Sequence, residues 1–182
     1  MLKKQILIIL FVFISCSLLA QENKKLDSLM SIKLGTSKSK VLSQMSDAKY
    51  GKGYEKQNSE IGFSQIIYEN PGNKQFAGFS FEYLWFQFLD DKVYTICITF
   101  PKQKVGKTEL QEIVAAYQEK YTFAVKKNEL YSFYLETSDR ICLTFNWNTS
   151  LGSVITLFDL PISDIKEERE KELKKNKIHD DI

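Results

Sequence analysis

Few side chains in this sequence are of a type that could perform catalysis. The only histidine, His179, is the fourth residue from the C-terminus and lies in a charged segment. A catalytic histidine has to be held within hydrogen-bond reach of its nucleophile, and a chain end does not hold it there. No G-x-S-x-G elbow and no phosphate-binding glycine loop occurs. We therefore expect no catalytic, metal or cofactor site.

Carboxylates are the remaining candidates for acid–base chemistry or calcium binding. They are Glu69, Glu82, Asp90, Asp91, Glu136 and Asp139. Asp90-Asp91-Lys92 is typical of a hairpin turn, and Asp139 follows Thr-Ser in a second turn. We interpret these residues as structural and predict that the protein is not an enzyme.

Two cysteines, Cys97 and Cys142, lie in predicted strands between apolar residues. Alternation along each strand directs both thiols to the sheet face opposite Ile96 and Ile141. A cross-strand disulfide is one outcome, if the two strands pair and the compartment is oxidising. Two small buried thiols are the other. The sequence leaves both open.

An excess of aromatic residues is the one pattern that indicates a function. Phe79, Phe81, Tyr83 and Trp85 form one row, and Leu84, Phe86 and Phe88 form the opposite row. A sheet covered by helices on one side needs only one apolar face. Tyrosine and tryptophan are enriched at protein interfaces. We predict a binding face at Tyr83 and Trp85, with Tyr94 and Tyr134 as lesser candidates.

Residues 1–20 have the layout of a secretory signal peptide. Lys3 and Lys4 precede the apolar run 5–15, and Ala20 offers a cleavage site. The run is about half of the ~20 residues that a spanning helix needs, so we expect no membrane span. A lipid anchor at Cys16 is the alternative to cleavage after Ala20. Either processing route predicts export to a bacterial periplasm or cell envelope, or secretion.

The charge of the chain argues against nucleic acid as a partner. Lys and Arg number 25 and Asp and Glu number 23, and two of the lysines lie in residues 1–20. Residues 21–182 therefore carry 23 charges of each sign. A neutral chain of mixed charge has no electrostatic attraction for a polyanion.

The hydrophobic pattern predicts one α+β domain over residues 21–161 and a charged helical tail over 162–182. Helices are expected near 26–30, 37–45 and 108–121, and strands at 61–69, 76–88, 93–100, 129–136, 140–147 and 153–158. Residues 46–60 are expected to form a loop, and Pro71-Gly72 a type II turn. Thr108 is the expected start of a capping box, and Ser163 or Asp164 the expected cap of the tail helix. The order predicts an antiparallel sheet of about six strands, with helices packed on one face.

An internal echo points to a duplication. Ile96-Cys-Ile-Thr-Phe100 recurs as Ile141-Cys-Leu-Thr-Phe145, at an offset of forty-five residues. The echo predicts two tandem modules, residues 32–100 and 107–158, each with a helix followed by three strands. Chance reuse of strand-forming residues is the alternative explanation.

The segment LGTSKSKVLSQM, residues 34–45, precedes the first predicted meander. It resembles the small exported helix-plus-three-strand modules of the BamE-like lipoproteins and the β-lactamase inhibitor proteins. Gly35, Thr36, Val41 and Met45 match the turn and helix of that pattern. The resemblance implies a secreted binding module rather than an enzyme, and it implies no particular partner or contact residue.

We therefore expect an exported, non-catalytic binding module that contacts a protein partner, of unknown identity, through the open sheet face. The alternative is a carrier or sensor of an apolar small ligand that is held between helix and sheet.

Overall fold

The structure is a computed structural model that describes residues 26–45, 50–69, 71, 74–101, 104–121, 123–126, 132–149 and 152–180. The predicted signal peptide, the lipid anchor at Cys16 and most of the type II turn at Pro71-Gly72 lie outside the described residues.

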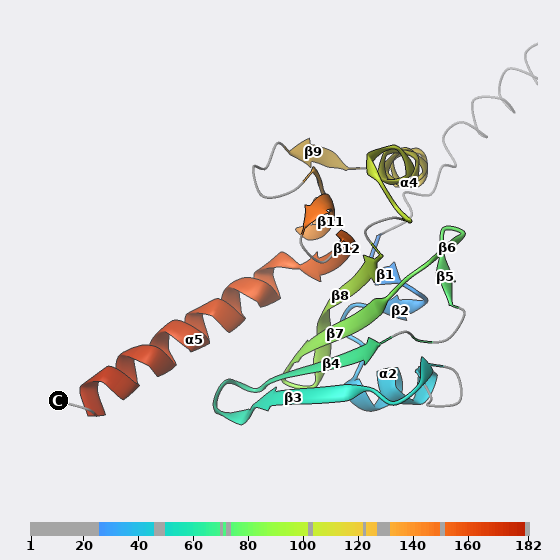
Figure 1. Cartoon of the computed structure of the whole chain (residues 1–182). Helices are drawn as coiled ribbons and strands as arrows, with labels where there is room; N and C mark the ends of the chain where they lie inside the picture. The colour runs from blue at the N-terminus through green and yellow to red at the C-terminus, as the bar shows by residue number, and fades with distance from the viewer. Residues whose placement is uncertain are drawn as a thin grey trace, which may run out of the picture.

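The centre of the fold is an antiparallel sheet, which confirms the predicted α+β class (Figure 1). Within the described residues it has eight strands, where about six were expected. Their order across the sheet is β3 (Tyr54–Asn58), β4 (Phe63–Glu69), β7 (Tyr83–Leu89), β8 (Lys92–Phe100), β12 (Gly152–Asp159), β11 (Ile141–Thr149), β10 (Phe133–Glu136) and β9 (Ala124–Lys126). The two unexpected strands, β3 and β9, are the edges, and residues 54–58 were predicted to be loop.

Two four-stranded meanders meet at the middle of the sheet. One runs β3-β4-β7-β8 and the other β9-β10-β11-β12, and their last strands pair with each other. A helix precedes each meander: α2 (Lys38–Gln44) the first and α4 (Lys107–Lys120) the second. In this arrangement β8 corresponds to β12, whereas the echo of forty-five residues aligned β8 with β11. The echo therefore reflects similar core-facing residues in β8 and β11, not equivalent positions in the two meanders.

Helices α2 and α4 confirm the two helices predicted at 37–45 and 108–121, and both pack on one face of the sheet. Val41 of α2 and Leu110, Ile113 and Val114 of α4 join the buried core. The cap of α4 lies two residues before the predicted Thr108, because the Gly106 amide donates a 2.9 Å hydrogen bond to Glu109 Oε2.

Two predicted elements are wrong because the chain turns tightly within them. Residues expected to form a helix at 26–30 make a hairpin of β1 (Ser28–Leu29) and β2 (Ile32–Lys33), with Met30 and Ser31 at positive φ. The long strand predicted at 76–88 is interrupted by a hairpin of β5 (Gln75–Phe76) and β6 (Phe79–Ser80), which turns at Ala77-Gly78. Leu29, Ile32 and Phe81 are buried in both cases, so the apolar residues reach the core by a different route.

The C-terminal helix α5 (Leu160–Asp180) extends from β12 on the side of the sheet opposite α2 and α4 (Figure 1). Its cap is Asp159, whose Oδ1 accepts a 3.1 Å hydrogen bond from the Ile162 amide, and not the predicted Ser163 or Asp164. Pro161 lies in the first turn of α5, where the missing N–H removes no helical hydrogen bond.

An arginine attaches α5 to two turns of the first meander. Arg169 donates two 2.8 Å hydrogen bonds to the Asp90 carboxylate in the β7–β8 turn, and another of 3.0 Å to the Ile61 carbonyl. Ile61 ends the short 3₁₀ helix η1 (Ser59–Ile61). The hydrogen bond from Arg169 lowers the pKa of the Asp90 carboxyl. Gly62 makes room for this contact, because a Cβ there would lie 2.3 Å from Asp90 Oδ1.

We predict that Gly62→Ala loosens α5 as well as destabilising the fold. Gly62 has φ +69° and Gly51 has φ +74°, so alanine at either position costs about 1–2 kcal/mol of backbone strain. A Cβ at Gly51 meets nothing within 4 Å, which makes Gly51→Ala the matched control. Urea unfolding should show a larger loss of unfolding free energy for Gly62→Ala than for Gly51→Ala. Hydrogen exchange of the α5 amides should accelerate in Gly62→Ala alone. Equal behaviour of the two variants in both measurements would contradict this prediction.

Candidate functional site on the open face of the sheet

The two faces of the central sheet have different surroundings. The core face carries Phe86 and Ile96, which are fully buried. The opposite face, here called the open face, carries Tyr83 and Trp85 of β7 and Cys97 of β8. Trp85 lies directly opposite Cys97, and Tyr83 lies opposite Thr99. Directly paired residues of an antiparallel sheet point to the same side, so these side chains form one surface.

A hollow of about 240 Å³ lies on the open face. Its lining residues are Gln65, Ile67, Glu69, Tyr83, Trp85 and Thr99, and we call it the Trp85 hollow. Ile67 pairs with Trp85 and Glu69 pairs with Tyr83 across β4 and β7. Thr99 of β8, opposite Tyr83, completes the lining. The Trp85 hollow is the candidate functional site.

Tyr83 and Trp85 are both half-buried and together line the Trp85 hollow. Phe79 and Phe81 were expected in the same row. The interruption between β6 and β7 sends them to the core instead, where Phe81 is 4% exposed. Ile67 was not singled out from the sequence. The sequence feature that points to Ile67 is the Ile66-Ile67 pair, because two consecutive residues of a strand face opposite sides and one isoleucine must then lie on each face.

Tyr94 was predicted to belong to the binding face, and the structure corrects this. Gln87 pairs with Thr95 and Phe88 pairs with Val93, so Tyr94 is the extra residue of a β-bulge. Its side chain is only 2% exposed. Burial, and then the nearby charge of Glu170 in α5, raise the pKa of Tyr94. The phenol is therefore unavailable to a partner while α5 is in place.

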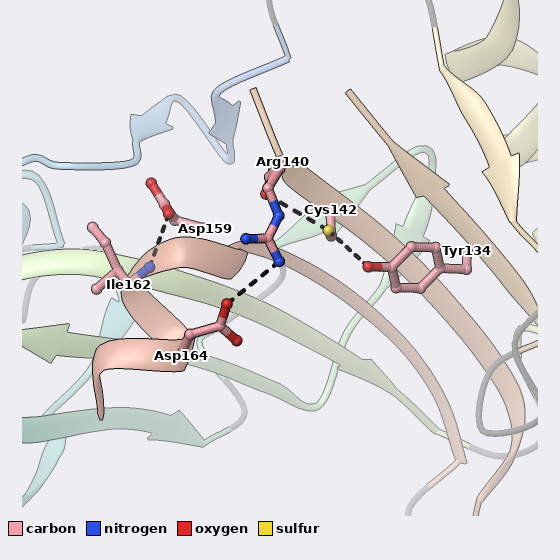
Figure 2. Close-up of polar contacts among 6 residues, drawn as sticks. All are labelled: Tyr134, Arg140, Cys142, Asp159, Ile162 and Asp164. Carbon is pink, nitrogen blue, oxygen red and sulfur yellow. Dashed lines mark hydrogen bonds and ion pairs between the residues drawn. The ribbon is translucent and has the colours of Figure 1, made fainter. Parts of the chain in front are cut away.

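Tyr134 is also corrected, because its hydroxyl is used inside the protein. Figure 2 shows the hydroxyl oxygen of Tyr134 facing Cys142 Sγ, at 3.0 Å. The Cys142 thiol is also within 3.7 Å of the Arg140 carbonyl, which it reaches as a donor. Arg140 in turn pairs with Asp164 near the start of α5, at 3.3 Å. Burial and the contact with Cys142 raise the pKa of Tyr134.

Cys97 and Cys142 are buried free thiols, so the structure rules against the cross-strand disulfide. Strand β12 lies between β8 and β11, and it separates the two cysteines. Cys97 lies opposite Thr156, whose hydroxyl donates to Cys97 Sγ at 3.4 Å, and Cys142 lies opposite Phe158. Burial raises the pKa of Cys97 to about 12. The Cys97 thiol is therefore neutral at physiological pH and a poor nucleophile.

The carboxylates do not gather into a metal-binding group in the part of the chain that the structure describes. No group of three or more His, Cys, Asp and Glu side chains lies close enough there to hold a metal ion. Asp90 is bound by Arg169, and Glu136 is buried in β10. His179 lies at the end of α5, and its side chain is outside the described residues. Among the described helices, none is both long enough and apolar enough to cross a bilayer.

Comparison of the chain with protein-family models, with curated proteins and with solved structures gives no significant match.

We predict that both thiols resist alkylation in the folded protein. Iodoacetamide at pH 8 should leave Cys97 and Cys142 unmodified without denaturant, because both thiols are buried away from the reagent and the raised pKa of Cys97 also keeps that thiol neutral. In urea both should react. Intact mass of residues 21–182 under non-reducing conditions should correspond to two free thiols. A mass lower by two hydrogens would instead identify a disulfide.

Proposed function

We propose that this chain is an exported, non-catalytic binding protein of a bacterial periplasm or cell envelope, and that it contacts a protein partner through the open face. The observation that carries the proposal is the Trp85 hollow, where Tyr83, Trp85 and Ile67 remain half-buried on a face that α2 and α4 do not cover. Partly exposed tryptophan and tyrosine next to an aliphatic residue are typical of the centre of protein interfaces.

The size of the Trp85 hollow favours a protein side chain over a small-molecule ligand. Its volume of about 240 Å³ is below the roughly 300–1,000 Å³ of sites that enclose a drug-sized ligand. The hollow also lies on the surface of a sheet, so it would leave much of such a ligand in water. A protruding side chain of a partner fits this geometry better.

The space between α4 and the sheet does not favour the alternative of an internal ligand carrier. Leu110 and Phe145 are fully buried there, and the Tyr117 ring packs edge-on against Phe145 with 6.1 Å between ring centroids. The side chains of the protein itself therefore occupy the region where a carried ligand would lie.

Export is the part of the proposal that rests on the sequence. Residues 1–20 have the order of basic residues, apolar run and cleavage position that secretion requires. A partner would then be met outside the cytoplasm. The mass of the mature protein separates cleavage after Ala20 from lipidation at Cys16.

Site-specific photo-crosslinking in the source cells tests the proposed contact. A photoreactive phenylalanine analogue at position 83 should give a discrete adduct, and the same analogue at Leu42 should not. Leu42 is 41% exposed but lies on α2, which covers the core face, so it is the matched control.

Trp85→Ala should weaken the adduct from position 83 substantially. Truncating a tryptophan at the centre of an interface costs about 2 kcal/mol or more, which is roughly 30-fold in affinity. Circular dichroism and thermal unfolding of the purified variant control for misfolding. An adduct of equal yield from positions 42 and 83, or one unaffected by Trp85→Ala in a folded variant, would rule out binding through the open face.

A further inference from the structure

The Trp85 hollow combines aromatic rings with one negative charge. Glu69 is the only charged residue among its lining residues, and it is exposed at the end of β4. It lies directly opposite Tyr83, and the neighbouring pair on the same face is Ile67 with Trp85. The hollow therefore presents a carboxylate, two aromatic side chains and an aliphatic wall to the same small volume.

Several carboxylates of this chain form ion pairs with its own basic residues. Asp27 pairs with Lys33 at 2.8 Å, Asp90 with Arg169 at 2.8 Å and Glu60 with Lys177 at 3.1 Å. Glu69 is among the carboxylates without such a partner, since no basic side chain forms an ion pair with it within the described residues.

Four half-exposed aromatic rings elsewhere in the described residues each have a lysine of the same chain over them. Lys107 Nζ lies 5.3 Å from the centre of the Trp147 ring, and Lys166 Nζ lies 5.4 Å from that of Phe63. Lys74 and Lys120 cover Tyr50 and Tyr121 in the same way. In the described part of the chain, no lysine or arginine is placed over Tyr83 or Trp85.

We infer that the Trp85 hollow binds a basic side chain, lysine or arginine, of the protein partner. This inference rests on the proposed function and names the chemistry of the contact. The apolar stem of the side chain packs on Ile67 and Trp85, as such stems do on exposed apolar surfaces. The cationic group then lies against the aromatic faces and beside the Glu69 carboxylate. The cation–π interaction with the rings and the ion pair with Glu69 both stabilise the cationic end of the side chain.

Amino-acid amides test this inference without a known partner. The chain contains two tryptophans, Trp85 and Trp147, so its indole N–H signals in an NMR spectrum report on the hollow and on an internal control. Trp147 already has Lys107 over its ring. Nα-acetyl-arginine amide and Nα-acetyl-lysine amide should shift the Trp85 signal in a saturable manner and leave that of Trp147 unchanged. Nα-acetyl-leucine amide and Nα-acetyl-glutamate amide should bind more weakly.

Glu69→Gln removes the charge and keeps the shape of the side chain. We expect arginine amide to bind up to about fivefold more weakly to this variant, the upper end of the range for an exposed charge pair. The matched control is Glu112→Gln, since Glu112 is exposed on α4 and far from the hollow in the fold. It should bind like the unmodified protein. Raising the salt concentration should remove most of the difference between Glu69→Gln and its control.

Two results would overturn the inference. One is that leucine amide binds as tightly as arginine amide and that Glu69→Gln changes the affinity for neither amide. The hollow would then be a purely apolar contact. The other is that no basic amide shifts the Trp85 signal up to 100 mM, about the weakest binding such a titration detects. In either case an adduct from position 83 that depends on Trp85 would leave the proposed function standing. Loss of that adduct would be the separate failure of the proposed function.

Discussion

The pairing of β8 with β12 is the contact on which the rest of this structure depends. It joins the two meanders through six pairs of directly opposed residues, from Ser153 opposite Phe100 to Phe158 opposite Thr95. Because paired residues share a face, the register places Ile96 and Ile98 with Leu157 and Ile155 against the helices. The same register assigns the alternate pairs to the open face: Thr95 with Phe158, Cys97 with Thr156 and Thr99 with Val154. A slip by one residue would exchange the two sets and bury threonine and cysteine where isoleucine now packs.

The open face is shaped by what covers it as much as by its own residues. Helix α5 attaches at that side through polar contacts, chiefly the pairing of Arg169 with Asp90, and leaves the Trp85 hollow uncovered. Such exposed ion pairs are weak and are screened by salt. The bulge that buries Tyr94 lies towards α5, whereas Tyr83 and Trp85 lie towards the other end of β7. One face of the sheet thus has a covered part and an accessible part, and only the accessible part can meet a partner.

Local pattern was enough to predict the elements that have a strong period of their own. The helix at Lys107–Lys120 and the strand at Lys92–Phe100 fall within two residues of their predicted limits. The pairing of distant strands is not encoded locally, so the separation of Cys97 from Cys142 by β12 could not be foreseen. The burial of the Tyr134 hydroxyl could not be foreseen either. The sequence around Tyr134 alternates as in any strand, and the contact of its hydroxyl with Cys142 depends on how the strands pair. Tyr83 and Trp85 could be chosen as candidate site residues from the sequence, because the excess of aromatic residues is visible there.

The edge strand β3 has a consequence for the behaviour of the protein in solution. Tyr54, Glu55, Lys56 and Gln57 are all exposed, and Lys38 of α2 reaches Glu55 to form an ion pair. An uncovered strand edge offers unpaired backbone groups to any other extended chain, and charged side chains on that edge discourage the approach. The mixed lysine and glutamate of β3 therefore act against sheet-to-sheet polymerisation. Without these charges, the edge strand of each copy would be a template for the edge strand of the next.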